Sequence, residues 1–142
     1  MKKDELETLI NNAWSKETCY PKYKDEWEEK HPSYGQSLVT SLVVNDFFGG
    51  EIARCMSSTG GHYYNLIDDK IVDLTIKQFH GESVLYANSE IVSKEDLLTK
   101  NDNLDRYIIF LNNIKKNITN MYFEVTDVFD NNIVGHVLKK KK

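Results

Sequence analysis

The chain has 142 residues, of which 40% are hydrophobic and 28% are charged, as in an ordinary globular protein. Its formal net charge of -4 argues against a nucleic-acid-binding surface, which is expected to be basic. No apolar run approaches the ~18 residues that a membrane-spanning helix needs, and the start, "MKKDELETL", has acidic residues where a signal peptide needs an apolar segment. We therefore expect a cytoplasmic protein that does not enter a membrane.

The length indicates a single domain, which we expect to cover residues 1–138. The four lysines at 139–142 are expected to form a disordered tail. In a reducing compartment, Cys19 and Cys55 are expected to be unpaired. The sequence has no Cys/His metal spacing and no glycine-rich phosphate loop, so we expect neither a metal nor a cofactor.

The first half of the chain predicts two helices separated by a long loop. Apolar residues at helical spacing predict a helix over 3–14. Residues 15–35 are polar, contain both prolines and predict a loop that is either functional or partly helical. A second helix, over 36–48, is apolar around most of its circumference and is therefore expected to be nearly buried. Gly49-Gly50 ends it.

The second half predicts strands first and then a helix. The sequence predicts a strand over 51–58, a turn at 59–61, and a hairpin of 62–67 and 70–74 that turns at Asp68-Asp69. Capping-box patterns at 75–78 and 93–96 predict two short helices. An amphipathic helix is predicted over 103–118, with one apolar stripe made of Leu104, Tyr107, Ile108, Leu111, Ile114 and Ile118. A closing hairpin is predicted over 121–138.

Helices and antiparallel strands are mixed without a βαβ rhythm, which indicates an α+β fold. Within this fold, Ser37, His62 and Asp73 form a candidate catalytic group. Ser37 is at the start of the buried helix, His62 is at the start of a strand, and Asp73 is on the partner strand of that hairpin. Nucleophilic catalysis needs a nucleophile, a base and an acid that orients the base. A helix N-terminus adds free N–H groups that lower the pKa of a thiol and stabilise an oxyanion.

The hairpin register tests this hypothesis. A two-residue turn at Asp68-Asp69 places Tyr64 opposite Asp73, so that His62 is a diagonal neighbour of Asp73 on the same face. A three-residue turn would place Asp73 on the wrong face. Each residue also has a simpler interpretation: Ser37 as a helix cap, His62 as a surface or core residue, and Asp73 as part of the turn into the next helix.

Two resemblances support the catalytic interpretation. The segment "GHYYNLIDDKIVDLT" (61–75) resembles the His and Asp strands of transglutaminase-like, papain-related hydrolases. Over roughly residues 10–115 the chain more closely resembles the YunG-like family of small bacterial proteins, whose activity is uncharacterised. This resemblance rests on four segments: "WSKETC" (14–19), "GQSLVTSLVVNDFFGGEI" (35–52), "GGHYYNL" (60–66) and "VDLTIKQF" (72–79).

The resemblance implies a core with a central helix packed on an antiparallel sheet. It implies Ser37 as the nucleophile, His62 as the base, Asp73 as the orienting acid and Gln36 as an oxyanion donor. The implied chemistry is acyl transfer or amide hydrolysis on a peptide, protein or amide substrate that the sequence does not name. The sequence does not indicate the oligomeric state either.

Position 37 departs from the family pattern, in which Gly-Gln-Cys is usual. Three explanations remain open: an engineered Cys-to-Ser change, a naturally inactive site, or a working serine nucleophile. The last needs a more closely placed base, because an alcohol does not ionise as a thiol does. The alternative function is a non-catalytic binding or scaffold protein on the same fold.

Overall fold

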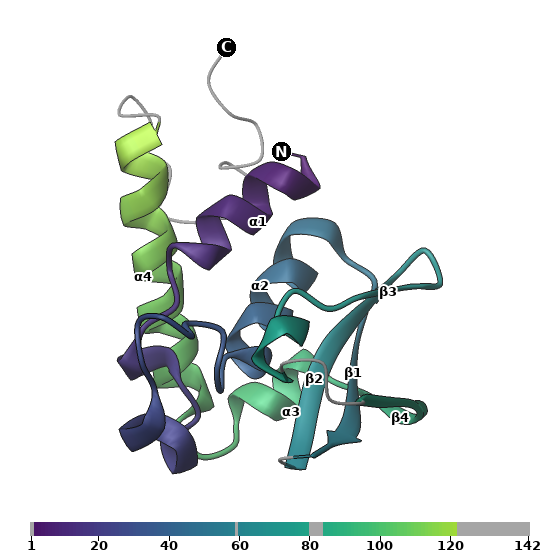
Figure 1. Ribbon diagram of the computed structural model, residues 1–142. Helices are drawn as coiled ribbons and strands as arrows, with labels where there is room; N and C mark the ends of the chain where they lie inside the picture. The colour runs from purple at the N-terminus through teal and green to yellow at the C-terminus, as the bar shows by residue number, and fades with distance from the viewer. Residues whose placement is uncertain (1, 59, 80–83, 122–142) are drawn as a thin grey trace.

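The computed structural model describes residues 2–58, 60–79 and 84–121 and has a mixed α+β architecture (Figure 1). The elements in chain order are α1 Lys3–Asn11, η1 Lys16–Thr18, η2 Pro21–Glu26, α2 Ser37–Phe48, β1 Glu51–Ser57, β2 Gly60–Ile67, β3 Lys70–Val72, η3 Ile76–Phe79, β4 Val84–Val92, α3 Lys94–Leu98 and α4 Asn103–Met121. The η elements are short 3₁₀ helices. The loop predicted at 15–35 is therefore partly helical.

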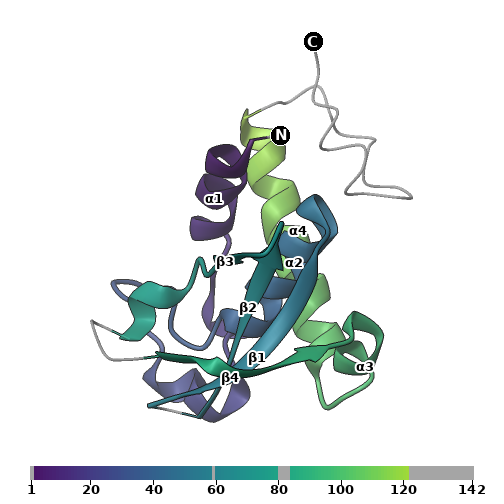
Figure 2. The same cartoon turned by 90° about the vertical axis from the view of Figure 1, so that its right-hand side faces the viewer.

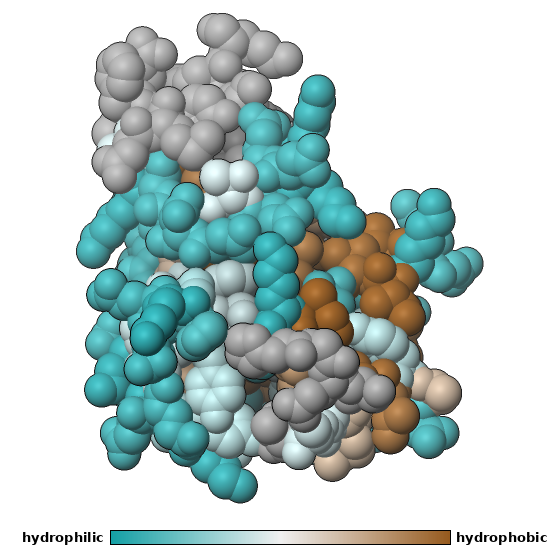
Figure 3. Space-filling view, in the orientation of Figure 1, coloured by the Kyte–Doolittle hydropathy of each residue, from teal (hydrophilic) through white to brown (hydrophobic). Residues whose placement is uncertain are grey.

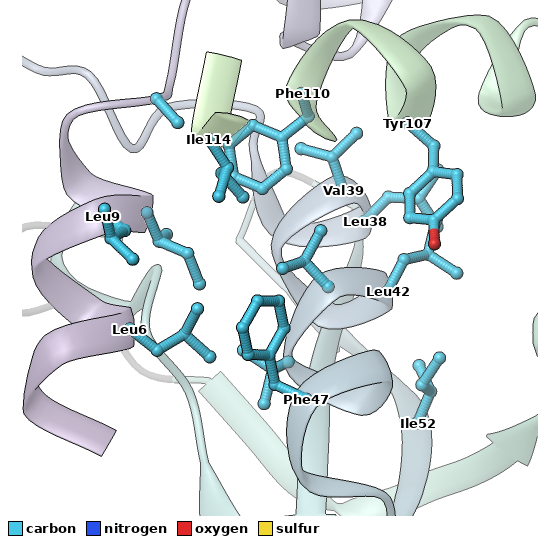
Figure 4. Packing of buried hydrophobic residues seen from close by; sticks show 14 of the residues in the cluster. Leu6, Leu9, Leu38, Val39, Leu42, Phe47, Ile52, Tyr107, Phe110 and Ile114 are labelled. Atoms are coloured by element: carbon cyan, nitrogen blue, oxygen red, sulfur yellow. The ribbon is translucent and has the colours of Figure 1, made fainter. Parts of the chain in front are cut away.

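The four strands form one antiparallel sheet in the order β3-β2-β1-β4. The helices α1, α2 and α4 all lie on one side of this sheet (Figures 1 and 2). The hydrophobic core fills the space between α1, α2 and α4 and the near face of the sheet (Figure 4). A smaller cluster of Ala53, Cys55 and Tyr64 forms on the sheet's other face.

The hairpin of β2 and β3 has the predicted two-residue turn. Asp68 and Asp69 have φ values of 52° and 63°, which is the geometry of a type I′ turn. The pairs Asn65 with Val72, Leu66 with Ile71 and Ile67 with Lys70 follow the predicted register. The strand β3 is short, however, and pairs with only this end of β2.

Small and polar side chains hold α2 close to β2. The side chain of Asn65 donates a hydrogen bond to the Ser41 carbonyl at 2.9 Å. Thr40, also on α2, accepts a hydrogen bond at its Oγ1 from the Trp14 indole N–H at 2.9 Å. These small residues leave room for a close helix–strand approach, so the N-terminus of α2 lies against the first half of β2.

The predicted stripe of the last helix is only partly correct. Tyr107, Ile114 and Ile118 are buried, whereas Leu104 and Ile108 are 45% and 46% exposed. Two polar residues, Asn103 and Arg106, are buried instead. They are anchors: Asn103 Nδ2 donates to the Leu97 carbonyl at 2.8 Å, and Arg106 Nη1 donates to the Thr18 carbonyl at 3.2 Å. A search for apolar spacing alone does not detect such anchors.

Two other elements differ from the expectations. Strand β4 has no counterpart among the predicted elements, although it pairs along β1 with a bulge between Arg54 and Met56. Residues 76–79 form a 3₁₀ helix, and the Thr75 hydroxyl donates to Asp73 in place of a capping box. The second cap is confirmed, because Ser93 Oγ accepts from the Asp96 amide.

Some predictions lie partly or wholly outside the described residues. They are the closing hairpin over 121–138, the lysine tail at 139–142, and the start of the 59–61 turn, whose two glycines already belong to β2. Within the described part of the chain, no helix is long and apolar enough to cross a membrane. In Figure 3, apolar residues gather on the side of β3, whereas the side of η2 and α4 is mostly hydrophilic.

A matched pair of substitutions on α4 tests its orientation. We expect Phe110→Ala to lower the free energy of unfolding by about 3–5 kcal/mol, because this fully buried ring would leave a cavity. Leu104→Ala is expected to cost less than about 1 kcal/mol, since that side chain is largely exposed. Urea unfolding measures both; equal costs would contradict the observed helix face.

Candidate functional site

Ser37 is the first residue of α2 and its hydroxyl faces the exposed edge of β2. The amide of Tyr63 donates a hydrogen bond to Ser37 Oγ at 3.2 Å. This amide is free for Ser37 because β3 pairs with β2 only from Asn65 onward. The amides of Ser37 and Leu38 donate to no described residue, as is usual at a helix N-terminus. Ser37 therefore lies among free backbone donors.

His62 and Asp73 form the contact that the hairpin register predicted. His62 Nε2 lies 2.7 Å from Asp73 Oδ2, and their side chains are 1% and 5% exposed. The Phe79 ring and the imidazole pack in a T-shaped arrangement, with 4.8 Å between ring centroids. Such packing limits the rotation of His62, so the carboxylate holds the ring in one orientation.

The Asp73 carboxylate accepts hydrogen bonds from three elements. Tyr86 OH on β4 donates to Oδ2 at 2.7 Å, while the Thr75 amide and hydroxyl donate to Oδ1 at 3.3 and 3.4 Å. Burial raises the pKa of Tyr86, and the hydrogen bond to Asp73 raises it further. Tyr86 therefore remains a protonated donor at neutral pH.

The contact with Asp73 assigns the roles of the two His62 nitrogens. A carboxylate accepts hydrogen bonds, so Nε2 carries the proton in the neutral ring. Nδ1 is then the acceptor, and no described residue donates to it. A base that is oriented by a carboxylate through one nitrogen and free on the other meets the requirement for proton transfer.

A cavity of about 190 Å³ lies between the N-terminus of α2 and β2. Both Ser37 and His62 line it, but no hydrogen bond joins their side chains in the described structure. The structure thus brings the predicted nucleophile and base to one cavity and joins the base to the acid. The direct contact between Ser37 and His62 is not formed.

The structure places Gln36 elsewhere, and its side chain does not line the cavity. Gln36 Nε2 donates to the Ser15 carbonyl at 2.8 Å, and its Oε1 accepts from the Thr18 hydroxyl at 2.6 Å. The side chain is fully buried. Gln36 therefore fastens the η1 segment to the start of α2, and this geometry argues against the predicted oxyanion role for its amide.

Gln78 is the glutamine that lines the cavity, and sequence reasoning did not single it out for chemistry. Its Oε1 accepts from the Gly35 amide at 3.1 Å. Its buried Nε2 has no described acceptor. A buried donor without a partner costs free energy, so this amide is available to a ligand oxygen. The signal in the sequence, a glutamine in the 75–78 pattern, indicated only a helix cap.

Gly35 is required by its surroundings. Its φ is +72°, and a Cβ there would lie 2.5 Å from Cys19 Sγ. Its carbonyl accepts from the Tyr20 amide at 2.8 Å. With the Gln78 contact, both backbone groups of Gly35 are bonded, which fixes the residues that lead into Ser37.

The two cysteines are free and buried. Burial raises the pKa of Cys19 to about 11, and burial followed by the charge of Asp73 raises the pKa of Cys55. Neither is therefore an activated nucleophile. Among the described residues, no group of three or more His, Cys, Asp and Glu side chains is placed to hold a metal ion.

Comparison with known proteins identifies the family. The pattern of the family described as YunG protein matches residues 2–119. The chain belongs to the YunG family. It is 33% identical over 76 residues to the "Uncharacterized protein YunG" of Bacillus subtilis (strain 168). This stretch covers 54% of the chain and 62% of that relative, less than two thirds of its length. No solved structure matches the chain.

Membership of the YunG family confirms the closer of the two resemblances noted in the sequence. The relative's printed name assigns no reaction. The chemistry of the cavity therefore rests on its own residues.

The structural role of Gln36 is tested by removing its amide. We expect Gln36→Leu to lower the free energy of unfolding by about 1–3 kcal/mol, because the Ser15 carbonyl and Thr18 hydroxyl would lose their partner. The control, Asn112→Leu, makes a similar change at an exposed position of α4 and should be nearly neutral. A neutral Gln36→Leu would contradict this role.

The buried thiols of Cys19 and Cys55 are expected to react slowly with thiol reagents in the folded protein. At pH 8 the Cys19 thiolate fraction is about one in a thousand, given its pKa of about 11. A disulfide reagent such as DTNB should therefore react slowly with Cys19 and Cys55 until guanidinium unfolds the chain. Fast reaction of either thiol in the native protein would show that it is accessible.

Proposed function

We propose that the cavity at the N-terminus of α2 is an acyl-transfer site of the cysteine-hydrolase type, with Ser37 at the nucleophile position. One observation carries this proposal: His62 is hydrogen-bonded to Asp73 and lines the same cavity as Ser37. The order of the three residues and their places on a helix and a hairpin agree with a transglutaminase-like or papain-like core. That core is part of the proposal.

The reaction would cleave an amide or ester through a covalent intermediate. His62 Nδ1 takes the proton of the nucleophile at position 37, which bonds to the acyl carbon. The bond to the leaving amine or alcohol breaks, and His62 returns the proton to it. Water or a second amine then attacks the acyl carbon, the bond to residue 37 breaks, and His62 passes the acceptor's proton back to residue 37. The free Ser37 and Leu38 amides and Gln78 Nε2 are the candidate donors to the oxyanion.

A serine hydroxyl in place of a thiol at position 37 lowers the rate of acyl transfer at this site. A serine hydroxyl needs its base in direct contact, yet Ser37 Oγ accepts from the Tyr63 amide and is not bonded to His62. A thiol has a reference pKa near 8.5 and ionises beside a histidine without such close contact. The site is therefore suited to sulfur, and acyl transfer is expected to be low in this chain and restored by Ser37→Cys.

The second candidate function is binding without turnover in the same cavity. Two observations favour it: the Tyr63 hydrogen bond to Ser37 and the 1% exposure of His62. In this case the cavity would hold a peptide or amide ligand, and His62 and Asp73 would form a structural polar pair. The two functions differ in what a thiol at position 37 does.

The test is Ser37→Cys treated with p-nitrophenyl acetate and analysed by intact mass and peptide mapping. We expect a single acetyl adduct on the introduced thiol, release of p-nitrophenolate, and an iodoacetamide reaction whose midpoint lies below pH 8.5. Adding His62→Gln should move the midpoint upward and slow acylation by about tenfold or more. The parent chain should give far less adduct.

Asn112→Cys is the matched control, because it places a thiol at an exposed position of α4. Its midpoint should lie near the ordinary value of a free thiol. If the thiol of Ser37→Cys also titrates there and His62→Gln changes nothing, the acyl-transfer proposal is wrong and binding without turnover is the better account.

A further inference from the structure

The charged side chains that line the cavity all have one sign. The basic residues among them are Arg54, Lys100 and Arg106, and no described aspartate or glutamate is among the lining residues. The chain as a whole has a net charge of -4, so the charge of the cavity lining is opposite in sign to that of the whole chain. Positive lining residues in a confined space attract and hold anions.

Two of the three cations have no described partner. Arg106 is engaged, because its three nitrogens donate to Asp102, Thr18 and Asn103. Arg54 and Lys100, by contrast, form neither an ion pair nor a side-chain hydrogen bond with a described residue. A partly buried guanidinium with five unused donors is costly unless a ligand completes it.

The backbone is shaped to hold the Arg54 guanidinium beside the site. Arg54 pairs with Tyr63 on β2, the residue whose amide reaches Ser37. Its guanidinium lies flat against Gly61, where a Cβ would come within 2.5 Å of Nη2. The glycine thus admits the guanidinium, and the next residue along β2 is His62. Arg54 and His62 both line the cavity, although their side chains start from opposite faces of the sheet.

Two acidic side chains, Glu90 and Asp96, line a neighbouring hollow together with Arg54 and Lys100. Glu90 is opposite Arg54 on β4, and Asp96 is on α3. In the described structure neither forms an ion pair with Arg54 or Lys100. The guanidinium is thus available to a ligand on the cavity side, where Gln78 Nε2 is a further donor without a described partner.

We propose that the cavity selects a carboxylate-bearing acyl group, with Arg54 as the main carboxylate-binding residue and Lys100 as a second. A guanidinium pairs with a carboxylate through two parallel hydrogen bonds. The volume of about 190 Å³ admits a group of the size of a glutamyl or aspartyl residue. This inference deepens the acyl-transfer function proposed above and rests on it only for the claim that the bound group is an acyl group. The binding of the carboxylate does not depend on that function.

The binding test uses the parent chain and needs no chemistry. A ¹⁵N-labelled sample is titrated with N-acetylglutamate, with the uncharged diamide N-acetylglutaminamide as the matched probe and inorganic phosphate as a second anion. We expect N-acetylglutamate to shift the amides of Gly61, Tyr63 and Leu38, the other probes to shift them less, and added salt to weaken the effect. Equal shifts with the acid and the amide would overturn the proposal, and so would stronger shifts with phosphate.

The selectivity test uses Ser37→Cys and two alkylating reagents of similar size, the anion iodoacetate and the neutral iodoacetamide. We expect the iodoacetate-to-iodoacetamide rate ratio to exceed that of Asn112→Cys by about tenfold, as charge steering predicts. Arg54→Gln should remove most of this excess, Lys100→Gln part of it, and Arg54→Lys should retain some. Lys116→Gln, at an exposed position of α4, should leave it unchanged.

Gly61→Ala is an independent variant, since it displaces the guanidinium without removing its charge. It should reduce both the iodoacetate preference and the N-acetylglutamate shifts, with the fold checked by circular dichroism. If the Arg54 and Gly61 variants keep the full preference, the carboxylate proposal is wrong even where acylation proceeds. If the carboxylate binds but no ester acylates the thiol, the acyl-transfer function fails and this inference stands.

Discussion

The burial of the Asp73 carboxylate is the constraint on which the arrangement of the site depends. A buried charge is tolerated only when it is paired and hydrogen-bonded. Asp73 meets this condition with donors from β2, from β4 and from Thr75 just before η3, so one carboxylate joins both strands to the turn into η3. Moving any one of these segments would remove part of the hydrogen bonding that the buried charge needs. The orientation of His62 follows from this network.

A second set of contacts prepares the other wall of the cavity. Gln36 fastens the η1 segment to the start of α2, and Gly35 bonds to Gln78 and Tyr20. These contacts fix where α2 begins and hence where Ser37 lies. The two walls are built separately, one from the sheet and one from the loop before α2. The distance between nucleophile and base is therefore set by how both walls pack, which no local pattern in the sequence encodes.

The sequence predicted the local features well and the long-range ones poorly. The turn at Asp68-Asp69 has an even length, which was enough to place Asp73 beside His62. The roles of the two glutamines were not predictable in this way, because both depend on partners far along the chain: Gln36 turns away to Ser15, and Gln78 reaches Gly35. Apolar spacing predicted only part of the buried face of α4, because Asn103 and Arg106 are buried through hydrogen bonds to backbone carbonyls, which the spacing does not detect. The sequence of β4 did not lead to a strand prediction.

The type I′ turn between β2 and β3 has an effect beyond the hairpin itself. Side chains alternate between the faces of a strand, so the number of residues in this exposed turn determines by its parity which face Asp73 occupies. Exposed turns accept insertions at little thermodynamic cost. A single added residue at this tip would therefore separate the carboxylate from His62 and would also turn Val72 and Leu74 away from the core. The even number of residues in this one exposed turn is thus a condition for having the acid beside the base.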